Sequence, residues 1–321
     1  MKREPYGLIL RNSLFAFAMG VLSVAAFAQQ SPDLSYNPPI ADPAYESGEG
    51  PIIGIDEAHA NFHTANGRYR PFAKLMERDG YRVVPFPKRA NVERLKTIDI
   101  LVIANPLHKR NNRNWKLPTP SAFSDSEIES INAWVKSGGS LLLIADHMPF
   151  PGGAGKLAES FGFRFSNGFA RYPNKPSGRP DLFQIGNGLI ESAITEGRSE
   201  RERVTRIGTF TGSAFLAPPE ARAILRFGAN AYSLEPKEAW KFNGDTPALK
   251  IEGWLQGAYM PWGSGRMAVF GEAAMFTAQV AGPQKRRIGM GSPHAPQNYQ
   301  LLLNTMHWLS GLIEVESKND P

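Results

Sequence analysis

The chain has 321 residues, no cysteine and a formal net charge of +6 at neutral pH. The absence of cysteine excludes disulfides, thiolate nucleophiles and thiolate metal sites. The basic residues are scattered, without a long basic run or a basic patch interleaved with aromatic residues, so we expect no nucleic-acid partner.

The first 28 residues predict a secretory signal peptide. A basic start with Lys2 and Arg3 precedes an uncharged apolar stretch over residues 13–27, and Ala26-Phe27-Ala28 forms a small-x-small cleavage pattern. The apolar stretch is shorter than the roughly 20 residues of a bilayer span, so no stable membrane span is expected after cleavage. Cleavage removes three basic residues and one acid, which lowers the net charge from +6 to +4. We expect an exported protein, periplasmic or secreted.

Three further segments follow from composition and pattern. Residues 29–50 are rich in Pro, Ser, Gly and acids, which predicts a flexible leader. A single α/β domain is expected over residues 51–313, and residues 314–321 are expected to form a tail.

The first half of the domain alternates apolar runs with helical patterns. Strands are predicted at 51–56, 81–86, 98–106 and 140–147, and helices at 70–80, 124–139 and 153–163. The helix at 124–139 has the clearest start and stop signals, because Ser124 or Asp125 caps its start and Gly138-Gly139 end it. This alternation predicts an α/β fold with a mostly parallel sheet and helices on both faces.

The second half is less regular. Patterns there predict strands at 204–210 and 221–227, an antiparallel hairpin over 253–272 that turns at Gly263-Ser264-Gly265, and a closing helix at 298–313. Residues 171–203 and 229–250 are polar connections without a readable periodicity.

Several of these segments resemble a known superfamily. A strand ending in Asp-Glu-Ala-His, then "DILVIANP" and "WVKSGGSLLLIADH", is similar to the class I glutamine-amidotransferase-like superfamily, near its exported trehalose-utilisation and gliding-motility type domains. "VTRIGTFTGSAF", "GRMAVFGEAAMF" and "NYQLLLNTMHWLSG" extend the similarity over residues 51–313. The resemblance implies a flavodoxin-like fold and carries no activity. The superfamily's amidotransferases place a cysteine on a turn after a central strand, where this chain has Asp146-His147, so glutamine hydrolysis by that mechanism is excluded.

Polar residues follow the predicted strands at their carboxyl ends. In open α/β sheets, ligands bind outside these ends, so we expect the polar residues to converge on one edge of the sheet. The candidate catalytic residues are Asp56, His59, Asp146, His147 and Glu272, and the candidate ligand-binding residues are His63 and Asn105.

The spacing of Asp56, His59 and His63 allows a metal site as an alternative. On a helix, intervals of three and four residues place all three side chains on one face. Histidine and carboxylate ligands in that arrangement can hold a divalent metal ion and leave a position for water. A metal-free polar site and purely structural roles, with Asp56 as a helix cap, remain open as well.

These residues support three hypotheses about function. The first is an exported α/β domain that recognises or hydrolyses a polar envelope or extracellular compound such as a glycan. The second is a non-catalytic module that binds an envelope protein, and the third is a metal-dependent hydrolase. Hydrolysis needs an activated water and a proton donor, which the polar cluster could supply.

The predicted signal peptide can be tested through its cleavage. Cleavage after Ala28 should give a mature chain that begins at Gln29. Intact-mass spectrometry of the protein recovered from the expressing cell measures this directly, with pyroglutamate formation at Gln29 as an allowed modification. A membrane-bound product that retains Met1 would contradict the signal-peptide interpretation.

Overall fold

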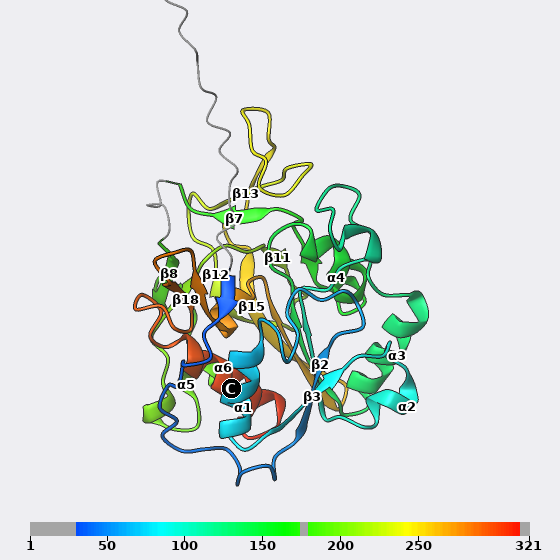
Figure 1. Cartoon of the computed structure of the whole chain (residues 1–321), viewed down its shortest axis with the longest axis vertical. Coiled ribbons are helices and arrows are strands. Elements are labelled where there is room, and N and C mark those ends of the chain that lie inside the picture. The colour runs from blue at the N-terminus through cyan, green and yellow to red at the C-terminus, as the bar shows by residue number, and fades with distance from the viewer. Residues whose placement is uncertain (1–29, 174–178, 315–321) are drawn as a thin grey trace, which may run out of the picture.

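The computed structural model describes residues 30–173 and 179–314 (Figure 1). The predicted signal peptide, its cleavage site and the tail beyond Glu314 lie outside the described residues. Within the described ranges, no helix combines the length and the apolar character that crossing a bilayer requires.

A twelve-stranded mixed sheet forms the centre of the molecule, with strand order β10-β8-β9-β12-β15-β16-β5-β4-β2-β3 and the short strands β11 and β6 beside it. Its parallel part consists of β2 (Ile52–Asp56), β3 (Arg82–Phe86), β4 (Ile100–Ala104), β5 (Ser140–Ile144) and β16 (Gly265–Phe270). If these five strands are numbered by their order along the chain, their order across the sheet is 2-1-3-4-5, which is the flavodoxin-like order. The predicted fold class is therefore confirmed.

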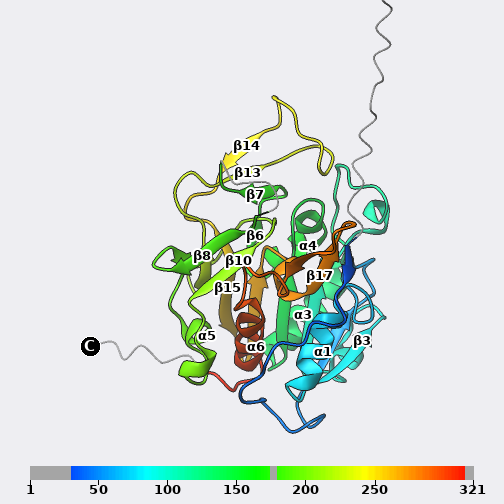
Figure 2. The same ribbon diagram turned by 60° about the vertical axis from the view of Figure 1, so that its left-hand side comes forward.

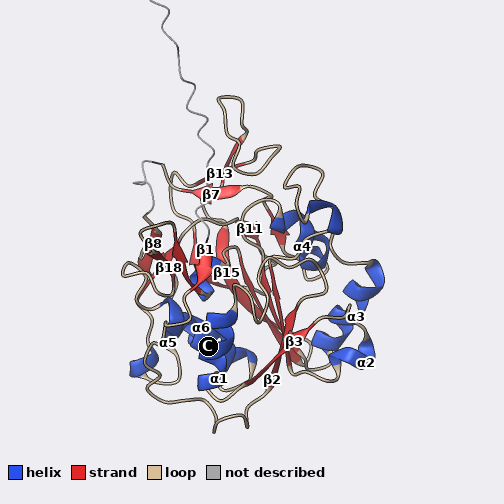
Figure 3. Cartoon of the chain, viewed as in Figure 1, coloured by secondary structure: helices blue, strands red, loops and turns tan. Residues whose placement is uncertain are grey.

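Helices cover both faces of the parallel strands (Figure 3). One face packs against α1 (Arg70–Arg78) and α6 (Asn298–Leu309), and the other against α2 (Val92–Leu95), α3 (Asp125–Lys136) and α4 (Phe150–Glu159). The central strands β4 and β5 are buried at every position and almost entirely apolar, because their alternate residues face opposite helical layers. A capping box formed by Ser124 and Glu127 begins α3, as the sequence predicts for Ser124.

The second half adds antiparallel strands to this core. The predicted hairpin is present as β15 (Leu255–Trp262) and β16, with Gly263 in the turn at φ 60°. In the sheet, β15 pairs with β11 (Phe215–Leu216) and β12 (Arg222–Arg226). Further elements of the second half are β6 (Arg164–Phe165), β8 (Asp181–Ile185), β9 (Gly188–Leu189), β10 (Arg206–Thr209), α5 (Ala193–Glu196) and the 3-10 turns η2 (Glu200–Glu202) and η3 (Ala274–Phe276), while the 3-10 turn η1 (Lys109–Asn111) follows β4.

Two small sheets stand over the carboxyl ends of the parallel strands. The first contains β7 (Phe169–Arg171), β13 (Tyr232–Leu234) and β14 (Ala248–Lys250), near the top of Figure 2. The second contains β1 (Gln30–Pro32), β17 (Ala278–Ala281) and β18 (Arg286–Gly289). Neither sheet is predicted by the sequence patterns.

Residues 30–50 differ from the flexible leader that their composition predicts. β1 pairs with β17 in antiparallel register, and Arg78 donates a hydrogen bond to the carbonyl of Pro38. Tyr36, Ile40 and Tyr45 pack against the main core. These apolar residues are spaced too far apart to form a periodic pattern, but each buries surface against the domain, and that burial orders the segment.

A buried charge network ties α6 to the end of α1. His307 Nε2 lies 2.7 Å from the Asp79 carboxylate, and His307 Nδ1 lies 3.8 Å from Glu202, which also binds Arg198. Burial lowers the pKa of His307, but the Asp79 hydrogen bond and the Glu202 carboxylate outweigh burial, so the pKa is raised above its ordinary value. The histidine therefore acts as a buried cation between two acids.

Asp79→Asn should destabilise the fold by about 3–5 kcal/mol, because it removes one partner of a buried ion pair. The pKa of His307 is raised in the folded state, so its stabilising contribution is fully present below its ordinary pKa and is lost as the pH rises through the raised value. The difference in the free energy of unfolding between Asp79→Asn and the wild type should therefore shrink over that same pH range. Urea unfolding across a pH series measures it.

Glu93→Gln is the matched control, because it breaks the exposed Glu93–Lys96 pair and should cost less than about 1 kcal/mol. The charge network would be contradicted if Asp79→Asn lost as little unfolding free energy as the control. A loss that grows as the pH rises would contradict it too.

Candidate functional site

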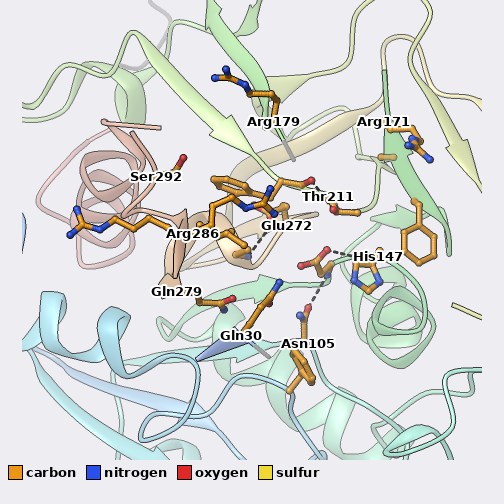
Figure 4. A pocket seen from close by; sticks show the side chains of 18 of the residues that line it. Gln30, Asn105, His147, Arg171, Arg179, Thr211, Glu272, Gln279, Arg286 and Ser292 are labelled. Atoms are coloured by element: carbon orange, nitrogen blue, oxygen red, sulfur yellow. Dashed lines mark hydrogen bonds between the residues drawn. The ribbon is translucent and has the colours of Figure 1, made fainter. Parts of the chain in front are cut away.

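A cavity of about 1030 Å³ opens at the carboxyl ends of β4, β5 and β16 (Figure 4). Five of the seven predicted site residues line it: His63, Asn105, Asp146, His147 and Glu272. They come from the segments that follow β2, β4, β5 and β16, so the strand-end rule correctly locates the part of the molecule in which they meet.

The remaining lining falls into an aromatic set and a basic set. The aromatic set comprises Phe62, Phe150, Phe169, Phe210, Trp240 and Phe242. The basic set comprises Arg171, Arg179, Lys285, Arg286 and Arg287. His294 also lines the cavity and receives a hydrogen bond from Arg179, which places the loop of His294 beside the site.

Asn105 connects the ends of two strands to His63. Its backbone has φ 52°, in the left-handed region, which asparagine tolerates better than most residues. The Asp146 N–H can only donate, so the Asn105 atom that it contacts at 2.8 Å is the amide oxygen. The amide nitrogen therefore faces His63 Nδ1, at 3.1 Å, and donates to it.

This hydrogen bond sets the tautomer of His63. Since Nδ1 accepts, the ring proton is on Nε2. Burial, with smaller contributions from Arg68 and His147, lowers the pKa of His63 to about 3, so the ring is neutral near neutral pH. Nε2 is buried without a hydrogen-bond partner in the described part of the chain. An unsatisfied buried donor costs about 1–3 kcal/mol, which makes this N–H a ready donor to a bound acceptor.

His147 has the complementary polarity. Its Nδ1–H donates to the Met148 carbonyl at 2.7 Å, which leaves a lone pair on Nε2. Burial lowers the pKa of His147, and this outweighs the opposing charge of Asp146, so the ring is also neutral. The ring stacks on Phe169 at 4.5 Å and meets Trp240 edge-on at 4.6 Å between centroids.

The two acids of the cavity accept hydrogen bonds from the backbone. Asp146 accepts from the N–H groups of His147 and Ala273, at 2.7 and 3.3 Å. Glu272 accepts from the N–H groups of Ala274 and Met275, at 2.9 and 2.7 Å, at the start of η3. These carboxylates therefore fix the turns after β5 and β16 in addition to lining the cavity.

Asp56 lies at the carboxyl end of β2, as predicted, but neither Asp56 nor His59 lines the cavity, which corrects their place in the predicted site. Asp56 holds His59 Nδ1 at 2.9 Å, and His59 Nε2 lies 3.0 Å from Glu127 of α3. Glu127 in turn pairs with Arg89 at 2.6 Å. Burial lowers the pKa of His59, but its contacts with Asp56 and Glu127 prevail and raise it. The cluster is a buried ion network on the α3 side of the sheet.

The predicted metal triad is not formed. Residues 57–69 contain no helix, so the expected single face does not exist. Both ring nitrogens of His59 face carboxylates, and Nδ1 of His63 is bound to Asn105. Across the described ranges, no group of three or more His, Asp or Glu side chains could hold a metal ion.

Sequence reasoning missed two parts of the site. Trp240, Phe242, Arg171 and Arg179 lie in or beside the segments that had no readable pattern. The run Lys285-Arg286-Arg287 is visible in the sequence, but nothing there indicates that a hairpin carries it to the cavity.

Solved structures share this fold. The chain is similar to the mmIFT52 N-terminal domain, with a TM-score of 0.59 at 16% identity over 82% of this chain and 100% of that one. It is also similar to a ThuA-like protein from Bacteroides uniformis, with a TM-score of 0.47 at 12% identity over 83% and 94% of the two chains. No protein-family model and no curated protein matches the sequence.

The chain therefore shares the fold of the mmIFT52 N-terminal domain, and it has the flavodoxin-like strand order that the sequence resemblance to the class I glutamine-amidotransferase-like superfamily implies. The chain has no cysteine, so it lacks the nucleophile of that superfamily's amidotransferases. At these identities the similarity establishes the fold alone, and function has to be argued from the site.

Asn105→Asp should change the tautomer of His63. A carboxylate cannot donate to Nδ1, so Nδ1 must carry a proton in the variant. Long-range ¹H–¹⁵N spectra should show wild-type His63 neutral, protonated on Nε2 and without titration down to about pH 5, because its pKa is near 3. The same spectra should show protonated Nδ1 in the variant. A wild-type ring that titrates like a free histidine would contradict the hydrogen-bond assignment.

Proposed function

We propose that the protein is exported and binds a polar compound of the envelope or the extracellular space, a glycan, in this cavity. The observation that carries the proposal is the pair of neutral imidazoles among the cavity-lining residues. His63 has a buried N–H without a partner in the described part of the chain, and His147 keeps the Nε2 lone pair because its Nδ1–H is donated to Met148. A sugar hydroxyl both donates and accepts hydrogen bonds, so it complements this pair.

The size of the cavity supports a ligand larger than a single small metabolite. Small-molecule pockets commonly measure about 300–1,000 Å³, and this cavity reaches about 1030 Å³. An oligosaccharide could fill that space, and no narrow tunnel is needed for it to enter.

The aromatic wall supports a glycan in particular. In this wall, the rings of Trp240 and Phe242 each meet the Phe169 ring edge-on, at 4.7 and 5.1 Å between centroids. Trp240 is 40% exposed and Phe242 is 38% exposed, although both are large apolar side chains. Such rings offer apolar area with little conformational entropy to lose, and sugar rings have apolar C–H faces that can lie against them.

The protonation states favour recognition over hydrolysis. His147 can accept a proton, but cleavage of a glycosidic bond also needs a proton donor for the leaving group. His63 is a neutral imidazole, and its N–H is a hydrogen-bond donor without useful acidity. Asp146 and Glu272 accept backbone N–H groups. We therefore propose a binding protein.

Trp240→Ala and His147→Ala should each weaken glycan binding by about tenfold, because each removes a ring or a hydrogen bond that contacts the ligand. Glycan arrays identify the ligand, and isothermal titration calorimetry measures the change. Val92→Ala is the control, since Val92 is 53% exposed and lies outside the cavity.

Incubation with the identified glycan should release no new reducing ends, which a mass-spectrometric assay detects. Equal binding by wild type and both cavity variants would contradict the proposed site. Release of products that depends on His147 would favour hydrolysis instead.

A further inference from the structure

The opening of the cavity is surrounded by cations from three separate parts of the chain. Arg171 comes from β7 and Arg179 from the segment before β8, while Lys285, Arg286 and Arg287 come from the β17–β18 hairpin. Figure 4 shows Arg171, Arg179 and Arg286 around the same space, above Asn105 and His147. We call these five residues the basic rim.

Most of the basic rim lacks carboxylate partners. Within the described ranges, Arg287 lies 4.0 Å from Asp33, and Arg179 is bound to the side chain of His294. Arg171, Lys285 and Arg286 have no acid within ion-pair distance there. Elsewhere in the described ranges some basic side chains do have acid partners, as in Arg70–Glu77, Lys96–Glu93 and Lys241–Glu238.

The described residues that line the cavity carry more positive than negative charge. The lining contains five cations against two carboxylates, Asp146 and Glu272, which leaves a surplus of three positive charges. Both carboxylates are buried and accept backbone N–H groups. His63 and His147 are neutral and so do not change this balance. A concave site with unpaired charge of one sign concentrates ligands of the opposite sign.

We infer that the ligand is an acidic saccharide, with carboxylate or sulfate groups that bind the basic rim while its sugar rings lie against the aromatic wall. This inference rests on the proposed glycan function and specifies its chemical class. Four of the five rim cations are arginines, and a planar guanidinium binds a carboxylate or sulfate through two parallel hydrogen bonds. Charges from three chain segments can contact anionic groups on successive sugar units.

The test compares three hexasaccharides with the full mature chain by isothermal titration calorimetry. Hexagalacturonate carries carboxylates alone, a chondroitin sulfate hexasaccharide carries carboxylates and sulfates, and maltohexaose is neutral. At least one acidic hexasaccharide should bind about tenfold more tightly than maltohexaose at low salt, and its affinity should fall as salt screens the charges. The two acidic probes distinguish a carboxylate ligand from a sulfated one.

The double variant Lys285→Ala/Arg286→Ala should weaken binding of the acidic hexasaccharide by about three- to tenfold, because two exposed cations without partners are lost. Lys109→Ala/Arg110→Ala is the matched control, since these adjacent cations are exposed but outside the cavity. It should bind like the wild type. Melting temperatures of both double variants should match that of the wild type, since all four residues are exposed.

Two results would overturn the inference and leave the glycan proposal standing. One is that maltohexaose binds as tightly as the acidic hexasaccharides and that Trp240→Ala weakens its binding. The other is that Trp240→Ala weakens binding of the acidic hexasaccharide, whereas Lys285→Ala/Arg286→Ala does not. Absence of binding by all three hexasaccharides, together with a negative glycan array, would overturn both the inference and the proposed function.

Discussion

The site depends on the Asn105 side chain, which connects the ends of β4 and β5 to His63. One amide supplies an acceptor for the Asp146 N–H and a donor for the imidazole, which a carboxylate or a hydrocarbon cannot do. The backbone at φ 52° adds a second constraint, because few side chains tolerate that conformation. The polarity of His63 and the position of Asp146 both follow from this residue.

Strand alternation explains why the predicted cluster divides into two. Ile55, Ile144 and Phe270 face the core layer of α1 and α6. Asp146 and Glu272 follow Ile144 and Phe270 by two positions and stay on that side, whereas Asp56 follows Ile55 by one and turns towards α3. Counting residues from the last buried strand position would have separated Asp56 from the other acids.

The sequence predicted well what depends on local pattern and poorly what depends on distant pairing. Apolar runs located the parallel strands, and Ser124 located the start of α3. The partner of His59 is Glu127, 68 positions away, and its identity follows from packing that no local pattern encodes. Trp240, Arg171 and the Lys285–Arg287 run reach the cavity through the β7–β13–β14 and β1–β17–β18 sheets, whose short strands give almost no periodic signal.

Backbone strain and charge are both concentrated at the cavity. Of the five non-glycine residues with positive φ in the described ranges, Asn105, Trp240 and Lys285 line it. Such conformations cost about 1–3 kcal/mol each for most residues, and unpaired cations close together add repulsion. Neither feature stabilises the empty fold. In the proposed complex, an acidic ligand would relieve the repulsion and contact the exposed Trp240 ring, so the charge that destabilises the free protein would favour binding.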